Sequence, residues 1–347
     1  MLRMDRRIVR SVFLYLLFIS VFSVSVKAQE KFRIMFYNVE NMYDTKDNPD
    51  KNDDDLTPTG QLRWTNYKYW KKLNNISKVI SAVGNGYPPA IVGLSEVEND
   101  SVLFDFTKKT SLRKHKYEYI GTYSKDIRSS NVALLYQRDQ IKIISKKTYT
   151  PVIDSVRTTR DILHVTGKVV NGKILDIFVC HFPSRSEGIK RTRPFRIACA
   201  KLLKQKTDSL LRIRKGVNII IMGDFNDYPN DISLSETLQA KPIVENVSEN
   251  ELYNMFYNKM ADKSIGSYKY RGKWNYIDQF IVSGHLLNPA NKVSIREKDA
   301  YVFIEEYLLT PDNKKYGGTK PLRTYSGFKY LGGYSDHLPI YMDLVIK

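Results

Sequence analysis

The sequence predicts a single α+β domain in which two packed mixed β-sheets are flanked by helices. Short runs rich in β-branched and aromatic residues recur along the chain, whereas helical periodicity marks only a few segments. The predicted strands cover residues 32–37, 90–94, 117–122, 132–136, 141–148, 162–170, 174–179, 217–222, 276–282 and 338–346. Because strands outnumber helices and often follow one another directly, a pair of packed sheets fits better than a doubly wound parallel sheet.

Apolar residues at helical spacing predict two longer helices and one short one. The first passes through residues 73–83, the second begins near Pro194 and passes through 197–211, and the short one follows Asp231. No internal repeat and no long linker divides the chain after Lys31. With 42% hydrophobic residues the chain can bury a substantial core, so we expect one domain over residues 29–347.

Residues 1–28 have the pattern of a secretory signal peptide. An uncharged run from Ser11 to Val26 follows several arginines and precedes the small-residue pattern Val26-Lys27-Ala28. Its sixteen residues fall short of the ~20 that a transmembrane helix needs, so an uncleaved membrane anchor is the weaker alternative. We therefore expect export to the periplasm or the medium. Cys180 and Cys199 lie in apolar patterns that favour buried free thiols.

Two polar stretches look like insertions into the domain. The segment from Asp44 to Gln61 is rich in aspartate, and the segment from Thr310 to Gly333 is rich in Gly, Lys and Tyr. Loops of this length in a compact domain are commonly functional or mobile. The acidic segment lacks the spacing of an EF-hand, so a solvated loop is favoured over a calcium site.

The formal net charge of +18 favours a polyanionic partner, either nucleic acid or an anionic membrane surface. A basic surface that only keeps the protein soluble is the equally weighted alternative.

Polar residues suited to catalysis stand where apolar runs end or begin. The strands at 32–37, 90–94 and 174–179 lead to Asn38, Glu96 and His181, and the strand at 217–222 leads to Asp224 and Asn226. Two further groups accompany the last strands, Asp278 and the pair Asp336 and His337. If the strands run in both directions, these segments meet at one rim of the sheets.

Carboxylates, amides and imidazoles at one rim suit a divalent ion such as Mg²⁺ or Mn²⁺, with Ca²⁺ as a further option. Zinc is less expected, because pairs of His or Cys at zinc-ligand spacing are absent from the sequence. Asp224 and Asn226 project to the same side if the strand continues, where they can bind water and an oxyanion. Asp278 is a candidate to fix the tautomer of His337.

The motifs, in this order, resemble those of the endonuclease/exonuclease/phosphatase superfamily, which includes deoxyribonuclease I. The matching segments are Tyr37-Asn38-Val39-Glu40-Asn41, Leu94-Ser95-Glu96-Val97-Glu98, Thr159-Arg160-Asp161, Cys180-His181-Phe182-Pro183-Ser184-Arg185, Met222-Gly223-Asp224-Phe225-Asn226-Asp227, Ile277-Asp278-Gln279-Phe280 and Tyr334-Ser335-Asp336-His337-Leu338-Pro339. The resemblance covers residues 31–347 and implies a four-layered αββα sandwich that hydrolyses phosphoesters with a divalent metal.

The resemblance also assigns roles to the metal ligands and to the residue that activates water. Glu96 is implied as the chief metal ligand, with Asn38 and Asp336 nearby. Asp224 is implied to position or deprotonate the attacking water.

Further roles concern the phosphate and the leaving group. Asn226 and Arg160 are implied to contact phosphate oxygens, as is His337, which Asp278 orients. His181 is implied to protonate the leaving group. Arg185, at the end of the His181 motif, is a further candidate phosphate ligand. An exposed basic residue is the alternative interpretation of both Arg160 and Arg185.

We therefore expect a metal-dependent phosphodiesterase, first of all an exported nuclease that acts through in-line attack of water. A phospholipid or sugar-phosphate phosphodiesterase or phosphatase is the alternative, with peripheral membrane contact as an option. A sandwich that binds anions without turnover is the third hypothesis. We expect a monomer and infer no protein partner.

Overall fold

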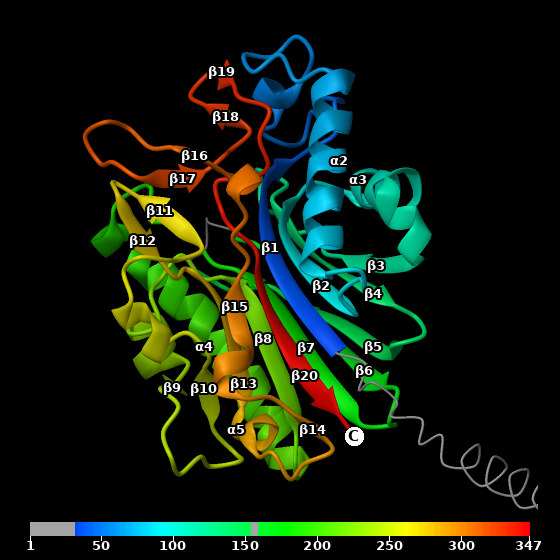
Figure 1. Ribbon diagram of the computed structural model, residues 1–347, viewed down its shortest axis with the longest axis vertical. Coiled ribbons are helices and arrows are strands. Elements are labelled where there is room, and N and C mark those ends of the chain that lie inside the picture. Colours follow the sequence, from blue (N-terminus) through cyan, green and yellow to red (C-terminus); the bar gives the residue numbers. More distant parts are fainter. Residues whose placement is uncertain (1–31, 154–158) are drawn as a thin grey trace, which may run out of the picture. The chain divides into compact units, whose positions relative to one another are not determined.

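Two seven-stranded sheets lie face to face at the centre of the computed structural model, which describes residues 32–153 and 159–347 (Figure 1). The predicted signal peptide lies outside the described residues. The first sheet has the order β14-β20-β1-β2-β4-β3, with β15 also paired to β20. The second has the order β5-β6-β7-β8-β13-β10-β9.

The strands of the two sheets have the following bounds. The first sheet comprises β1 (Phe32–Met42), β2 (Ile91–Val97), β3 (Tyr117–Gly121), β4 (Asn131–Gln137), β14 (Val293–Ser294), β15 (Ala300–Val302) and β20 (Ile340–Ile346). The second comprises β5 (Ile141–Tyr149), β6 (Ile162–Val169), β7 (Ile174–His181), β8 (Asn218–Asp224), β9 (Ala240–Lys241), β10 (Leu252–Asn254) and β13 (Asp278–Ser283). β1 pairs β2 in parallel and β7 pairs β8 in parallel, while β13 runs antiparallel to β8.

Alternating side chains on each central strand produce three hydrophobic layers. On β1, Ile34 and Phe36 enter the core between the sheets, whereas Met35 and Tyr37 enter the core beneath α2 (Asn66–Val83). This follows from the two-residue period of a strand. The second sheet buries its outer face against α4 (Ile189–Ile213), so the layers run helix, sheet, sheet, helix, as expected.

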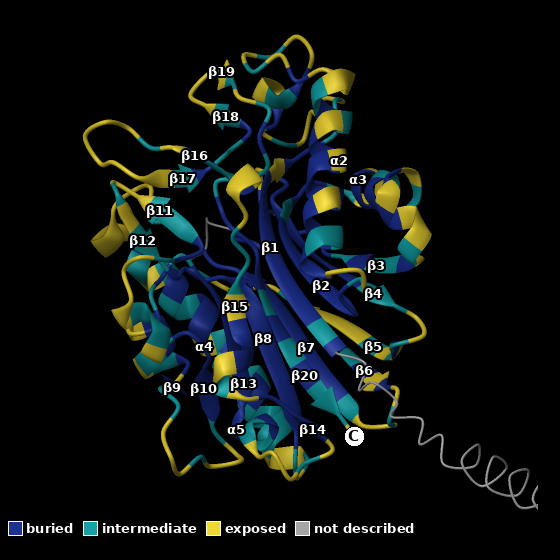
Figure 2. Cartoon of the chain, in the orientation of Figure 1, coloured by how far each residue is buried: buried dark blue, intermediate teal, exposed yellow. Residues whose placement is uncertain are grey.

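The central strands are the most deeply buried part of the described chain, and the loops and outer helix faces are exposed (Figure 2). A fully buried Val, Leu, Ile or Phe side chain contributes ~1.5–3 kcal/mol, which gives the sheets a rigid frame for polar residues at their ends. Cys180 and Cys199 are buried free thiols, as expected. No helix among the described residues is long and apolar enough to cross a membrane.

The remaining elements are short and connect the frame. The hairpin strands are β11 (Tyr268–Tyr270), β12 (Lys273–Asn275), β16 (Leu309–Pro311), β17 (Thr319–Pro321), β18 (Tyr325–Ser326) and β19 (Lys329–Tyr330). The short α-helices are α3 (Asp100–Phe104) and α5 (Gly284–Leu287), with 3-10 helices at Asp54–Leu56, Ser111–His115, Asn258–Ala261, Glu297–Asp299 and Glu306–Leu308 and π-helical turns at Asp105–Lys109 and Ser233–Thr237. The predicted insertion at 310–333 is thus folded into parts of two hairpins, β16–β17 and β18–β19.

Candidate active site

The ends of five strands of opposite direction meet at one rim of the sandwich. Asn38 stands beside Ser95 where β1 and β2 run parallel, and His181 stands beside Asp224 where β7 and β8 run parallel. Asp278 opens β13 and pairs with Asp224 across the antiparallel ladder. The carboxyl ends of four strands and the amino end of a fifth therefore share one edge, as the positions of the polar residues predicted.

A bulge in β2 turns Glu96 toward this rim. The register shifts between Ser95 and Val97, and Glu96 has a φ of 65°, in the left-handed region. Such a conformation costs ~1–3 kcal/mol in a residue other than glycine, so the surrounding contacts must hold it. One of them is the backbone N–H of Asn41, which donates to Glu96 Oε2 at 2.9 Å.

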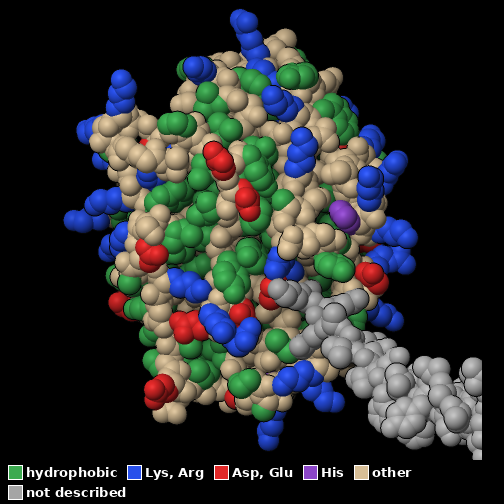
Figure 3. Space-filling view, in the orientation of Figure 1, with side chains coloured by type: hydrophobic (Ala, Val, Ile, Leu, Met, Phe, Trp, Pro, Cys, Tyr) green, Lys and Arg blue, Asp and Glu red, His purple; other side chains and the backbone are tan. Residues whose placement is uncertain are grey.

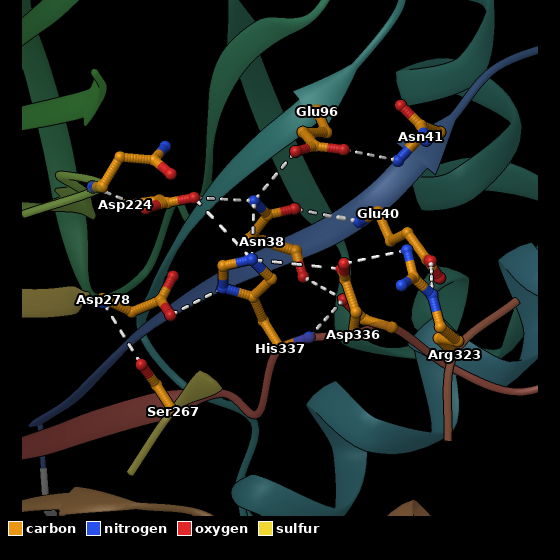
Figure 4. A network of polar contacts seen from close by, with 12 residues as sticks. Asn38, Glu40, Asn41, Glu96, Asp224, Ser267, Asp278, Arg323, Asp336 and His337 are labelled. Carbon is orange, nitrogen blue, oxygen red and sulfur yellow. Dashed lines mark hydrogen bonds and ion pairs between the residues drawn. The ribbon is translucent and has the colours of Figure 1, made fainter. Parts of the chain in front are cut away.

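Asn38 links the residues of the rim (Figure 4). Its Nδ2 donates to Glu96 Oε1 and to Asp224 Oδ2, each at 3.0 Å, and lies 3.5 Å from His337 Nε2. Burial opposes ionisation of Glu96, but Asn38, the charge of Arg160 and His337 keep its pKa below the ordinary value. Glu96 is therefore a carboxylate at neutral pH.

His337, Asp224 and Asp278 form a compact group of charged side chains at the rim. His337 Nδ1 lies 2.7 Å from Asp278 Oδ2, and Nε2 lies 3.8 Å from Asp224 Oδ2. Burial alone would lower the pKa of His337, but Asp278 and Asp224 raise it well above the ordinary value. Burial and the neighbouring Asp278 raise the pKa of Asp224 to about 7. Asp278 thus stands where it orients the imidazole.

Asp336 is held by an arginine that the sequence did not single out. Arg323 Nη2 lies 3.0 Å from Asp336 Oδ2, and Arg323 Nε donates to Glu40 Oε1 at 2.9 Å. Burial and Glu40 raise the pKa of Asp336 to about 6. Behind them, the buried Lys72 of α2 lies 3.7 Å from Glu40 Oε2.

His181 and Arg160 are both 4% exposed, so the interpretation of Arg160 as an exposed basic residue is wrong. His181 Nε2 lies 3.6 Å from Asp224 Oδ2, and Nδ1 has no hydrogen-bond partner among the described residues. Arg160 Nε and Nη1 are likewise buried without a partner there. Burial, with the positive charges of Arg160 and Arg128, lowers the pKa of His181 well below its ordinary value. Two buried groups at the rim therefore have hydrogen-bonding capacity left for a ligand.

Asn226 and Arg185 follow β8 and β7. The N–H of Asn226 donates to Asp224 Oδ1 at 2.9 Å, and its Nδ2 donates to Phe182 O at 3.1 Å. Arg185 pairs with Asp227 at 2.5 Å and with Asp231. The charge of Arg185 is therefore largely neutralised within the protein, although its side chain borders the site.

A pocket of about 870 Å³ opens over these groups. All the predicted site residues line it except Asn38 and Asp278, which are buried and contact its lining residues from behind. Tyr43, Tyr228, Tyr268 and Tyr270 add aromatic rings to its wall. The volume lies in the range of pockets that enclose a small molecule.

Two sets of donors at the rim suit a hard divalent cation. Glu96 and Asp336 line the pocket and offer the carboxylate oxygens that Mg²⁺ and Mn²⁺ prefer. Asn38, predicted as a further ligand, instead turns its Nδ2 toward Glu96, and its Oδ1 accepts from the N–H of Glu40. Asp224, Asp278 and His337 form a second set, with ligand atoms within 4.8 Å of one another. His337 and Asp278 interact with each other in the second set, and Asp336 is paired with Arg323 in the first, so both sets are partly engaged within the protein.

Comparison with known proteins agrees with this geometry. The sequence profile of the endonuclease/exonuclease/phosphatase family matches residues 33–346, so the chain belongs to that family. A search of curated proteins finds no significant match.

Solved structures with the same fold include an endonuclease/exonuclease/phosphatase family protein of Bacteroides thetaiotaomicron, with a TM-score of 0.56 and 17% identity over 91% of this chain and 98% of that one. A mannosyl-6-phosphatase of the same species has a TM-score of 0.56 and 16% identity over 91% and 100%. TDP2 of D. rerio in complex with a single-strand DNA product has a TM-score of 0.55 and 14% identity over 91% of this chain and 99% of that one. At these identities the likeness shows the fold alone.

Proposed function

We propose that this protein is a divalent-metal-dependent phosphoester hydrolase that is exported and acts on a small phosphate ester. The observation that carries the proposal is the junction of Glu96, Asp224 and His337 around one amide, that of Asn38, at the floor of a pocket. Two guanidinium nitrogens of Arg160 at the same pocket have no hydrogen-bond partner among the described residues. They support the proposal, because a buried cation with free donors suits an anionic ligand.

The residues of the rim divide the reaction between them. Asp224 orients a water and accepts its proton while the water oxygen bonds to phosphorus and the ester P–O bond breaks. The leaving oxygen takes up a proton from solvent. His337 and Arg160 donate hydrogen bonds to the phosphoryl oxygens, where negative charge accumulates.

A cation bound at Glu96 and Asp336 would neutralise part of the phosphoryl charge. His181, predicted to protonate the leaving group, has no carboxylate at Nδ1 among the described residues, and its lowered pKa favours the neutral ring. We propose that its neutral imidazole donates a hydrogen bond to a phosphate oxygen.

The arginines of the pocket favour a small ester over nucleic acid. Five arginines line the pocket. Arg128, Arg185 and Arg323 are each paired with aspartate or glutamate side chains. Arg160 has two buried nitrogens without a partner among the described residues, and the exposed Arg271 lies over the ring of Tyr270 at 5.2 Å. A polynucleotide needs a cation for each successive phosphate. Because three of the five lining arginines already have a counter-charge within the protein, we infer a small ester rather than a strand.

A nuclease is the second candidate, favoured by the formal charge of +18. A structural neighbour, TDP2, is known with a single-strand DNA product.

The test is hydrolysis with Mg²⁺, Mn²⁺ or EDTA. It is measured as phosphate release from hexose 6-phosphates and methyl phosphate, as p-nitrophenol release from bis(p-nitrophenyl) phosphate, as phosphocholine release from sphingomyelin, and as strand cleavage of plasmid DNA and RNA. We expect turnover of a small ester with metal, none with EDTA, and a loss of at least ~10³-fold in His337→Ala, as for removal of a transition-state donor. His285→Ala, on α5 and outside the pocket, is the matched control. Turnover that persists in EDTA or in His337→Ala would refute the proposal.

A further inference from the structure

A second cleft adjoins the pocket at the base of the β11–β12 hairpin. It has a volume of about 460 Å³, and Tyr228 and Asn275 line both spaces. The two spaces are therefore neighbours at these two side chains.

The β11–β12 hairpin connects the cleft to His337. Tyr268 pairs with Asn275 and Lys269 with Trp274 across β11 and β12. Tyr268 also forms a backbone bridge with His337, and the two rings lie 4.8 Å apart. Because Trp274 lines the cleft, its indole stands at a set position relative to His337.

The walls of the cleft are aromatic. Tyr228, Tyr257, Trp274 and Tyr276 all line it, and three of the four are partly exposed. Tyr228 and Tyr276 are supported from one side, by the guanidinium of Arg185 at 4.4 Å and by the ring of Phe256 at 5.3 Å. Supported rings of this kind present flat apolar surfaces at low entropic cost.

The polar groups of the cleft are amides, with little charge. Asn230, Asn258 and Asn275 line it, and Lys263 is the one charged side chain among its described lining residues. Asn275 Nδ2 donates to Lys273 O at 2.8 Å, which leaves Oδ1 as an acceptor for a hydroxyl group. A cleft with one lysine and no carboxylate is suited to a neutral ligand.

We propose that this cleft binds the leaving group of the substrate, and that this group is a sugar whose ring is joined to the phosphate through one exocyclic carbon and the ester oxygen, as in a hexose 6-phosphate. A sugar has an apolar face for the aromatic wall and hydroxyls for the amides. In a nucleoside 5′-monophosphate the ribose ring has the same place relative to the phosphate, and the base lies one ring further away. The inference rests on the proposed phosphoester hydrolysis and names its substrate class.

The experiment compares kcat/KM for hexose 6-phosphates with that for methyl phosphate, which carries no ring. We expect the wild-type protein to prefer a hexose 6-phosphate by at least roughly tenfold, and Trp274→Ala to reduce that ratio roughly tenfold. Ala261→Trp is the second variant, because Ala261 is exposed at the edge of the cleft and a larger side chain fills it without removing a packed ring. Tyr87→Ala, at a ring that is 79% exposed and lines neither space, should keep the wild-type ratio.

Each outcome decides between the two proposals. If none of the esters is hydrolysed in a metal-dependent way, the proposed function itself is refuted. Turnover of small esters with a ratio that neither Trp274→Ala nor Ala261→Trp changes would leave the function standing and refute the sugar site. A preference for nucleoside 5′-monophosphates over hexose phosphates that both variants abolish would assign the cleft to a base, and would also overturn the sugar site.

Discussion

At the residue level, the position of Asp224 between two charges of opposite sign controls its ionisation. Burial and Asp278 raise its pKa to about 7, and His337 opposes that increase. An acid whose pKa is raised becomes a base only above that value. Asp224 can therefore be protonated and idle at mildly acidic pH, although an isolated aspartate would be ionised there.

This charge arrangement predicts an acid limb in the pH–rate profile. Below about pH 7, kcat/KM should fall tenfold per pH unit, because Asp224 must be ionised to accept a proton from water. A cation bound at Glu96 favours the carboxylate form, so the limb lies at or below that pH in the metal-loaded enzyme. Initial rates between pH 4 and 9 provide the measurement. A rate that is constant over this range, or that rises as pH falls, would contradict the assignment of Asp224 as the base.

The same residues show how far a site can be predicted from sequence. Asn38, Glu96 and Asp224 were identifiable because each follows an apolar run, and a strand end has a fixed location in a sheet. Arg323 was not, because it reaches Glu40 across 283 positions of chain and its loop has no periodicity. The ion pair between Arg185 and Asp227 could not be predicted either, because it depends on how the turn after β8 places Asp227.

At the element level, the bulge in β2 holds Glu96 in a strained backbone conformation that directs its carboxylate toward the rim. Glu96 has positive φ next to residues with ordinary strand geometry, and the register of β2 against β4 shifts there. Bulges beside active sites commonly redirect a side chain in this way.

The strain at Glu96 can be measured by comparing alanine and glycine. Both Glu96→Ala and Glu96→Gly remove the carboxylate, but glycine adopts positive φ without a Cβ penalty. We expect Glu96→Gly to be the more stable of the two by about 1 kcal/mol in urea unfolding of the metal-free protein.

The matched pair for this comparison lies at Glu118 in β3, whose φ is not positive. There the order should reverse, with glycine less stable than alanine by about 0.5–1 kcal/mol. If glycine is the less stable residue at both positions, the bulge stores no strain.

Periodicity predicted the long elements well and the short ones poorly. Each of the ten predicted runs is a strand of the two sheets, because strands buried on one or both faces have a strong apolar pattern. The two- and three-residue strands have no room for a pattern. The second helix begins at Ile189, ahead of Pro194, because Thr192 bonds back to Gly188 O and receives a bond from Arg196, which is fully buried.

At the level of the whole molecule, the distribution of charge matters more than its total. The face in Figure 3 has Lys and Arg side chains dispersed around its edge, with hydrophobic and acidic groups between them. Within the pocket, three of the five lining arginines are paired with aspartate or glutamate, which reduces the positive charge that a substrate would meet there. A high net charge in this arrangement favours solubility and weak attraction of anions rather than a nucleic-acid track.

The salt dependence of turnover distinguishes these two uses of charge. A small ester contributes one phosphate, so kcat/KM should change by less than roughly threefold between about 50 and 200 mM salt. A strand held through 6–10 phosphates would lose about 10³–10⁵-fold in affinity over the same range. Measurement on the preferred ester at constant metal concentration tests this, with plasmid DNA in parallel. A steep loss confined to DNA cleavage, together with negligible turnover of small esters, would favour the nuclease, because only an extended polyanion releases that many counterions.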